Sequence, residues 1–286
     1  MICKKIKKVI LVIILFFIML PNYNMFSIAQ ETFELNTLLM KSTFKLAGNN
    51  TVGTCFILGK PIKEDPARGK FILITASHVL NNNTEDNMII FLRKKYDSFY
   101  EKIEWEIPIR KNGKPLWIEH PEVDVSAMYV KLPTDIDINL LPINFLADDY
   151  IFNKYEIHPG DEMVCLGYPF GAESNKAGFP ILRSGKIASY PIVPAKDTKN
   201  FLLDFEVFRG NSGGPVYFVQ ANRYYEGATH LGTIQFIAGL VSEEYSVTEE
   251  VVSLYESQKK IYPLSLAKII HASFIKEVIN MLPPVD

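Results

Sequence analysis

The sequence has few cysteines and lacks the cysteine pattern that holds many small secreted proteins together. Only Cys3, Cys55 and Cys165 occur in 286 residues. Cys55 and Cys165 lie far apart in apolar runs, where a thiol behaves mainly as a small hydrophobic group. A disulfide bond between these two cysteines is the alternative. There is no C-x-x-C motif and no histidine pair at helical spacing, so we expect neither a metal site nor a cofactor.

An excess of charge of one sign is also missing. The chain carries 30 Lys and Arg against 32 Asp and Glu, and no basic tract follows its first residues. A protein that holds nucleic acid normally presents a basic patch to the phosphates. The composition therefore excludes nucleic acid as an expected partner.

Long hydrophobic runs are scarce, and the one that exists lies at the start of the chain. Four lysines precede the apolar residues 9–20. As a helix this run spans only about 18 Å, whereas the apolar core of a bilayer is about 30 Å thick. The pattern predicts a signal peptide over residues 1–29, with cleavage after the small residues Ser27 and Ala29. The mature protein would begin at Gln30 and be secreted or periplasmic, without stable membrane insertion. An uncleaved membrane anchor is the alternative.

Beyond this segment the hydrophobic pattern is that of many short strands. Ile103, Trp105, Ile107 and Ile109 alternate with mostly charged residues, which is the period of two of a strand with one solvated face. Similar apolar segments cover residues 71–75, 88–92, 123–130, 163–166, 201–208, 215–219 and 233–241. Many short strands at such spacing favour an all-β barrel or sandwich.

Two other segments organise the chain. Residues 131–159 are rich in Asp, Asn and Pro and predict a bridge between an N-terminal lobe, residues 30–145, and a C-terminal lobe, residues 146–286. Near the end, apolar residues recur at steps of three and four and predict an amphipathic helix of about ten residues. They are Ile270, Phe274, Ile275, Val278, Ile279 and Leu282, followed by two prolines.

The strongest chemical signal is the segment Arg-Gly-Asn-Ser-Gly-Gly-Pro at residues 209–215. The glycines around Ser212 allow a sharp turn that presents backbone N–H groups beside the hydroxyl. The N–H groups of Gly210 and Ser212 would then form an oxyanion hole, because the tetrahedral intermediate of acyl transfer carries a negative oxygen. An ordinary glycine-rich hairpin turn is the alternative.

A serine nucleophile needs a base, and His78 is the candidate. It follows the predicted strand 71–75 within Thr-Ala-Ser-His-Val, and a neutral imidazole can accept the serine proton. Asp124 lies among apolar residues, where an unpaired carboxylate is costly to bury. A histidine partner resolves that cost, because the carboxylate fixes the imidazole tautomer and stabilises the imidazolium. Asp124 could instead cap a loop, and Asp135 and Asp137 are competing acids in a turn-like setting.

The segments Thr-Ala-Ser-His, Val-Asp-Val-Ser and Gly-Asn-Ser-Gly-Gly-Pro, in this order, resemble those of trypsin-like serine peptidases. The resemblance extends over residues 38–282 and is to the bacterial branch that lacks a PDZ-type module. It implies the chymotrypsin fold, two antiparallel six-stranded β-barrels with a short C-terminal helix. It also implies a secreted serine endopeptidase that acts on proteins or peptides through an acyl-enzyme, with His78, Asp124 and Ser212 as the catalytic triad.

The resemblance further suggests substrate-binding residues. Ser242 falls where the family has a serine near the buried aspartate, on the strand that pairs with the substrate backbone. Glu206, six residues before the nucleophile, would lie at the base of the specificity pocket and favour Lys or Arg in the substrate. Glu244 stands at the pocket mouth, where the family often has glycine. Strand alternation is the alternative, with Asp204 and Glu206 facing solvent.

Two other functions are open. Gly-Asn-Ser-Gly-Gly also fits the G-x-S-x-G turn of α/β-hydrolase esterases, which place an acid and then a histidine after the serine. Glu226 or Glu250 followed by His271 is formally possible, but residues 215–219 have the pattern of a strand instead of a helix. The second alternative is a non-catalytic binding protein with the chymotrypsin fold. Such proteins normally lack a member of the triad.

Overall fold

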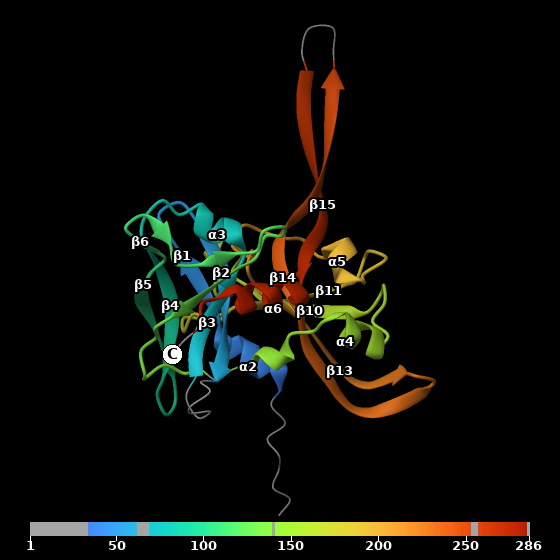
Figure 1. The fold of residues 1–286 in the computed structure, drawn as a ribbon, viewed down its shortest axis with the longest axis horizontal. Helices are drawn as coiled ribbons and strands as arrows, with labels where there is room; N and C mark the ends of the chain where they lie inside the picture. Colours follow the sequence, from blue (N-terminus) through green and yellow to red (C-terminus); the bar gives the residue numbers. More distant parts are fainter. Residues whose placement is uncertain (1–33, 62–68, 139–140, 253–256, 285–286) are drawn as a thin grey trace, which may run out of the picture. The chain divides into compact units, whose positions relative to one another are not determined.

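Antiparallel strands dominate the part of the chain described by the computed structural model, residues 34–61, 69–138, 141–252 and 257–284 (Figure 1). They form two large sheets with a short helix at the C-terminal end, as the sequence predicts. The expected signal peptide, residues 1–29, lies outside the described residues. No helix in the described ranges is long and apolar enough to cross a membrane.

The first sheet has seven strands in the order β5-β4-β1-β2-β3-β9-β8, with antiparallel neighbours throughout. The strands are β1 (Thr43–Ala47), β2 (Val52–Pro61), β3 (Gly69–Thr75), β4 (Asn87–Lys95), β5 (Tyr100–Pro108), β8 (Ile118–Glu119) and β9 (Ser126–Val130). The expected number was six. The difference is β8, a two-residue strand that pairs with the start of β9. A separate small ribbon pairs β6 (Arg110–Lys111) with β7 (Lys114–Pro115).

The second sheet has six strands, as expected, in the order β11-β10-β13-β14-β15-β12. They are β10 (Glu162–Gly167), β11 (Ile181–Lys186), β12 (Asn200–Leu203), β13 (Pro215–Tyr225), β14 (Ala228–Val252) and β15 (Ser257–His271). A bridge between Ile187 and Leu203 joins the two outermost strands. The sheet therefore curves far enough for its edges to meet.

The hairpin of β14 and β15 is the longest feature of the second sheet, and its outer half projects from the rest of the protein (Figure 1). Its pairing continues to Val252 opposite Ser257. Glu249 lies opposite Lys260, and Glu250 lies opposite Lys259. Opposite charges at facing positions of neighbouring strands stabilise the pairing. The acidic residues of β14 therefore face basic residues of β15 in this hairpin.

Short helices cover the ends of the sheets. They are α2 (Leu35–Ser42), α3 (Ser77–Asn81), α4 (Asp149–Lys154), α5 (Ala195–Thr198) and α6 (Ala272–Met281), with the 3₁₀ turns η1 (Ile143–Phe145) and η2 (Pro169–Gly171). Helix α6 confirms the predicted C-terminal helix, and it buries Phe274, Ile275, Val278 and Ile279. Ile270, which was expected to belong to it, lies in β15.

Two predicted strands are shorter than their apolar segments. The strand predicted over residues 123–130 begins only at Ser126, because Val125 N–H bonds back to Val123 O over 2.8 Å and bends the chain. The strand predicted over residues 201–208 ends at Leu203, because Phe205 N–H donates a hydrogen bond to Leu203 O and bends the chain. Asp124 is the corner residue of the first bend, so its side chain lies outside the pairing of β9 with β3.

Candidate active site

His78 and Asp124 are joined by two hydrogen bonds. His78 lies in α3, directly after β3, and Asp124 lies in the bend before β9, the neighbour of β3 in the sheet. The ring Nδ1 is 2.8 Å from Asp124 Oδ2, and the backbone N–H of His78 donates to Asp124 Oδ1 over 3.0 Å. Because an ionised carboxylate only accepts hydrogen bonds, Nδ1 carries the proton. The lone pair is therefore on Nε2, which forms no hydrogen bond with the described residues.

The environment of this pair favours its charged forms. Burial alone would lower the pKa of His78, but the hydrogen bond and the charge of Asp124, with a contribution from Glu243, raise the pKa above its ordinary value. Burial alone would raise the pKa of Asp124, but the bonds from His78 and from Ser242 hold the pKa below its ordinary value. Asp124 is therefore a carboxylate that stabilises a proton on the His78 ring.

Ser242 is a further hydrogen-bond donor to the Asp124 carboxylate. Its side chain is buried, and its Oγ donates to Asp124 Oδ2 over 2.6 Å. Ser242 belongs to β14 in the second sheet, whereas Asp124 belongs to the segment that enters β9 in the first. This bond therefore connects the two sheets at the candidate site, where the resemblance had suggested a serine near the aspartate.

Ser212 lies in residues 208–214, called here the glycine-rich loop, between β12 and β13. Asn211 N–H bonds to Phe208 O over 3.0 Å, and Gly214 N–H bonds to Asn211 O over 3.0 Å, so two tight turns follow each other. Their corners are Gly210, with a φ of 102°, and Gly213, with a φ of 86°. Only glycine adopts such angles without strain. The turns leave Ser212 partly exposed.

The two N–H groups beside Ser212 are directed away from the protein's own acceptors. Arg209 O accepts from Phe170 N over 2.6 Å. In a trans peptide the C=O and N–H point in opposite directions, so the N–H of Gly210 faces away from Phe170. Within the described ranges, the N–H groups of Gly210 and Ser212 have no hydrogen-bond acceptor, whereas Asn211 N–H is bonded.

The backbone around Ser212 is fixed against both sheets. Ser212 O accepts from Thr54 N of β2 over 2.8 Å. Gly213 N–H donates over 2.7 Å to Val241 O, the neighbour of Ser242 in β14. A side chain on Gly213 would also collide with Thr54 O and with Thr75 Oγ1 at the end of β3. Ser212 is therefore held between the strands that lead to His78 and to Ser242, although no hydrogen bond joins its Oγ to the His78 ring in the described structure.

A cavity of about 750 Å³ opens on the side of His78 and Asp124. Ser242 and Glu243 of β14 line it, together with Lys268 of β15. Two ion pairs lie in its wall, Lys268 with Glu243 at 2.9 Å and Lys199 with Glu122 at 3.0 Å. The cavity is open, and polar and apolar residues line it together. It is large enough for several residues of an extended peptide.

Glu206 does not lie at the base of a pocket. Its side chain is exposed, as is that of Asp204, whereas Phe205 and Val207 are buried. Exposed and buried side chains alternate here, as in the alternative given above, and the Glu206 carboxylate lies in solvent. The expectation that Glu206 is a buried charge at the base of the specificity pocket is therefore wrong. Glu244 is half-buried and pairs with Ala267 in the β14–β15 hairpin. Neither glutamate lines the cavity beside His78.

Thr54 is a site residue that the sequence analysis did not single out. Its Oγ1 donates to Gly210 O over 2.7 Å and accepts from Tyr168 N over 3.2 Å. Thr54 therefore ties β2, the glycine-rich loop and the end of β10 together. Thr54 lies in the segment Gly-Thr-Cys-Phe at residues 53–56 and Tyr168 lies in Gly-Tyr-Pro at residues 167–169, and neither segment by itself indicates these contacts.

The two described cysteines take no part in this site. Cys55 and Cys165 are buried free thiols, so they do not form the bridge left open by the sequence. Burial raises the pKa of Cys165 to about 12 and that of Cys55 further still, which keeps both protonated and unreactive. The described residues contain no group of three or more His, Cys, Asp or Glu that could hold a metal ion.

No protein-family model matches the chain, and no curated protein matches it. Among solved structures, it is similar to Rv3671c from M. tuberculosis H37Rv, in an inactive form with a serine replaced by alanine, at 14% identity and a TM-score of 0.42 over 87% of this chain and 92% of the other. A second structure, of the Rv3671c protease in an inactive form, is similar at 14% identity and a TM-score of 0.41, again over 87% of this chain and 92% of the other. The thermostable serine protease AL20 from an extremophilic microorganism is similar at 11% identity and a TM-score of 0.44, over 85% of this chain and 96% of the other.

Proposed function

We propose that this chain is an exported serine endopeptidase in which Ser212 is the nucleophile, His78 the general base and Asp124 the residue that orients the base. The observation that carries the proposal is the combination of an Asp124-bound His78 with a serine loop in which the N–H groups of Gly210 and Ser212 find no acceptor among the described residues. A nucleophile, an oriented base and two free donors are the parts that acyl transfer requires. Residues 1–29 support export through their basic and then apolar pattern.

The reaction begins when Ser212 Oγ attacks the carbonyl carbon of the scissile peptide bond and gives its proton to His78 Nε2. The carbonyl oxygen becomes an oxyanion, which the N–H groups of Gly210 and Ser212 stabilise. His78 then donates the proton to the leaving amine, and the C–N bond breaks to give the acyl-enzyme. Water, deprotonated by His78, hydrolyses the ester and restores the serine. The Ser212 hydroxyl has to turn toward His78, which is common because catalytic hydrogen bonds often tighten only with substrate bound.

Ser242 and the cavity have supporting roles in this mechanism. Ser242 keeps the Asp124 carboxylate ionised and in place by its 2.6 Å bond. The cavity beside His78 would take residues of the substrate next to the cleaved bond. We propose a protein or peptide as the substrate, and the steps given above use only side chains, backbone N–H groups and water.

An α/β-hydrolase mechanism does not fit the fold. Those enzymes place the serine on a turn from a strand of a mostly parallel sheet into a helix. Here Ser212 leads into β13, and both large sheets are antiparallel. The esterase alternative is therefore wrong.

A fluorophosphonate probe tests the proposal and separates it from a non-catalytic binding protein. We expect wild-type protein to be labelled on Ser212 and to hydrolyse a mixed peptide library. Labelling should disappear in Ser212→Ala and fall strongly in His78→Ala, but persist in the control Ser184→Ala, which removes an exposed serine of β11. Unlabelled wild-type protein, or a label that survives in Ser212→Ala, would contradict the proposed function.

A further inference from the structure

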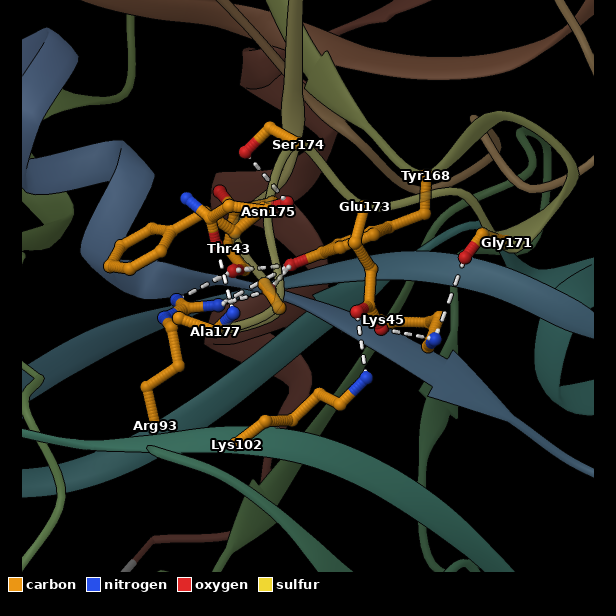
Figure 2. Close-up of polar contacts among 12 residues, drawn as sticks. Thr43, Lys45, Arg93, Lys102, Tyr168, Gly171, Glu173, Ser174, Asn175 and Ala177 are labelled. Carbon is orange, nitrogen blue, oxygen red and sulfur yellow. Dashed lines mark hydrogen bonds and ion pairs between the residues drawn. The ribbon is translucent and has the colours of Figure 1, made fainter. Parts of the chain in front are cut away.

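A buried polar cluster joins the first sheet to residues 168–179, the connection from β10 to β11, called here the bridging segment (Figure 2). Arg93 of β4 is at its centre and is only 1% exposed. Its Nη1 donates to Gly178 O over 2.9 Å, and its Nη2 donates to Thr43 O over 2.9 Å. The guanidinium also lies 4.4 Å from the centroids of both the Phe44 and Phe179 rings. Arg93 thus fixes the end of the bridging segment to β1 and β4.

Glu173 fixes the middle of the bridging segment. Its carboxylate is bound by Lys45 of β1 at Oε1 and by Lys102 of β5 at Oε2, the second bond measuring 2.7 Å (Figure 2). Burial alone would raise the pKa of Glu173, but the bonds from both lysines hold the pKa below its ordinary value. The side chains of Lys45 and Glu173 are largely buried, so this cluster is better protected from screening than a surface ion pair.

The start of the bridging segment contacts the glycine-rich loop. Phe170 N–H donates to Arg209 O over 2.6 Å, and this bond sets the direction of the peptide group that contains the Gly210 N–H. Phe170 adopts a φ of 53° to do so, an unfavourable angle that surrounding structure must impose. A side chain on Gly210 would collide with Tyr168 O, so the two segments lie in direct backbone contact.

Among the described residues, no ion pair within the glycine-rich loop or from it to another segment holds this peptide group. Asn211, at its centre, is buried and uncharged. The charged residue Arg209 is exposed, and its Nη2 donates to Asn50 O over 2.7 Å. The bond from Phe170 N therefore depends on how firmly the bridging segment is held, and the ionic contacts that hold it come from the first sheet.

We propose that Glu173 and Arg93 are positioning residues for oxyanion stabilisation. They hold the bridging segment in the position in which Phe170 N–H donates to the Arg209 carbonyl. This bond keeps the Gly210 N–H directed at the developing oxyanion. When the segment is released, the peptide between Arg209 and Gly210 can rotate and present its carbonyl oxygen to the oxyanion, which repels it. The proposal rests on the function proposed above for Ser212.

The test is Glu173→Gln, which keeps the size of the side chain and removes its charge. Losing one oxyanion donor costs about 10²–10³ in kcat, so partial loss of its orientation should lower kcat about ten- to a hundredfold. KM should change less than threefold, because the donor acts mainly in the transition state. The affinity for a peptide boronic acid, which forms a tetrahedral adduct, should fall by the same factor as kcat. Lys102→Met should behave like Glu173→Gln, and Lys102→Arg should retain activity.

The matched control is Asp161→Asn, which breaks a buried ion pair between Asp161 and Arg223 of 2.6 Å on the second sheet. This variant should lower the melting temperature and leave kcat per folded molecule unchanged. A Glu173→Gln protein with wild-type kcat and boronate affinity overturns the positioning role. So does an equal loss of kcat in Asp161→Asn, since the effect would then be general destabilisation. If the wild-type protein itself shows no Ser212-dependent hydrolysis, it is the proposed function that fails.

Discussion

Ser242 and His78 donate to the same oxygen atom of Asp124. Ser242 Oγ is 2.6 Å and His78 Nδ1 is 2.8 Å from Oδ2, while the backbone N–H of His78 occupies Oδ1. The carboxylate therefore accepts three hydrogen bonds, and each of its oxygens faces only donors. An amide at this position could not satisfy them, because its nitrogen is itself a donor.

Asp124→Asn should therefore inactivate the enzyme without unfolding it. The amide favours the His78 tautomer with its proton on Nε2, which cannot accept from Ser212, and we expect kcat to fall about 10⁴-fold. Ser242→Ala removes only one of the three bonds, so we expect a loss of about tenfold, equivalent to about 1.4 kcal/mol. Peptide hydrolysis and circular dichroism measure both effects. A loss below tenfold in Asp124→Asn would show that another acid orients His78.

The pH dependence of kcat/KM should report His78. Only the neutral ring accepts the serine proton, so activity should rise with pH as His78 deprotonates. Because Asp124 and Glu243 raise the pKa of His78, the midpoint should lie above the ordinary value of about 6.5. In Asp124→Asn the residual activity should rise at a lower pH, since the stabilising charge is gone. A rate that does not change between pH 5 and 8 would be incompatible with histidine as the base.

Two glycines with positive φ angles offer a matched pair of alanine substitutions. At Gly227, with a φ of 76° at the tip of the β13–β14 hairpin, an added Cβ meets no atom within 4 Å. Gly227→Ala should therefore cost about 1 kcal/mol of stability from backbone strain alone and leave kcat unchanged. At Gly210 the Cβ collides with Tyr168 O, so Gly210→Ala should displace the oxyanion donor and lower kcat more than a hundredfold. If the two variants had similar kcat values, Gly210 would not supply an oxyanion donor.

Substrate choice should not depend on Glu206. Its carboxylate is exposed and lies outside the cavity beside His78, so it cannot act as an uncompensated buried charge. We expect the cleavage profile of a mixed peptide library to be the same for wild-type protein and Glu206→Ala. A preference for Lys or Arg that disappears in Glu206→Ala would contradict this expectation and restore the pocket role suggested by the family resemblance.

The amino terminus of the exported protein tests the signal peptide. When the full chain is expressed in a secreting bacterium, mass spectrometry should find protein that begins at Gln30 in the exported fraction. The basic and apolar start of the chain is the reason for this expectation. Intact Met1 in the membrane fraction would favour the anchor instead.

Local motifs single out His78, Asp124 and Ser212 as candidates, because each lies in a short segment whose residue types suit its proposed role. The structure joins His78 to Asp124, and it adds the Ser242 bond that the family resemblance had suggested. Thr54 and Glu173 could not be selected in this way. Their contacts to Gly210 and to Lys45 cross more than a hundred residues of sequence, and no local pattern encodes such pairings.

The β14–β15 hairpin shows a different limit of sequence analysis. Residues 243–252 form a strand although their sequence is mostly polar and charged. Strands are recognised from sequence by a buried face that alternates with a solvated one. The side chains at residues 245–250 are all exposed, so neither face imposes that alternation. Pairing with β15 stabilises the strand, and the pairing becomes visible only in three dimensions.

The bond from Thr54 to Gly210 also has a consequence for the order of folding. It joins positions 156 residues apart in the chain, and contacts of such separation form late because closing a long loop of chain costs entropy first. The two turns of the glycine-rich loop are local, but the bonds from Thr54 to Gly210 O and Ser212 O form only when β2 of the first sheet meets the loop. If Ser212 is the nucleophile proposed above, a nascent or partly folded chain would carry it without this support, and peptidase activity would begin only after the first sheet and the loop have come together.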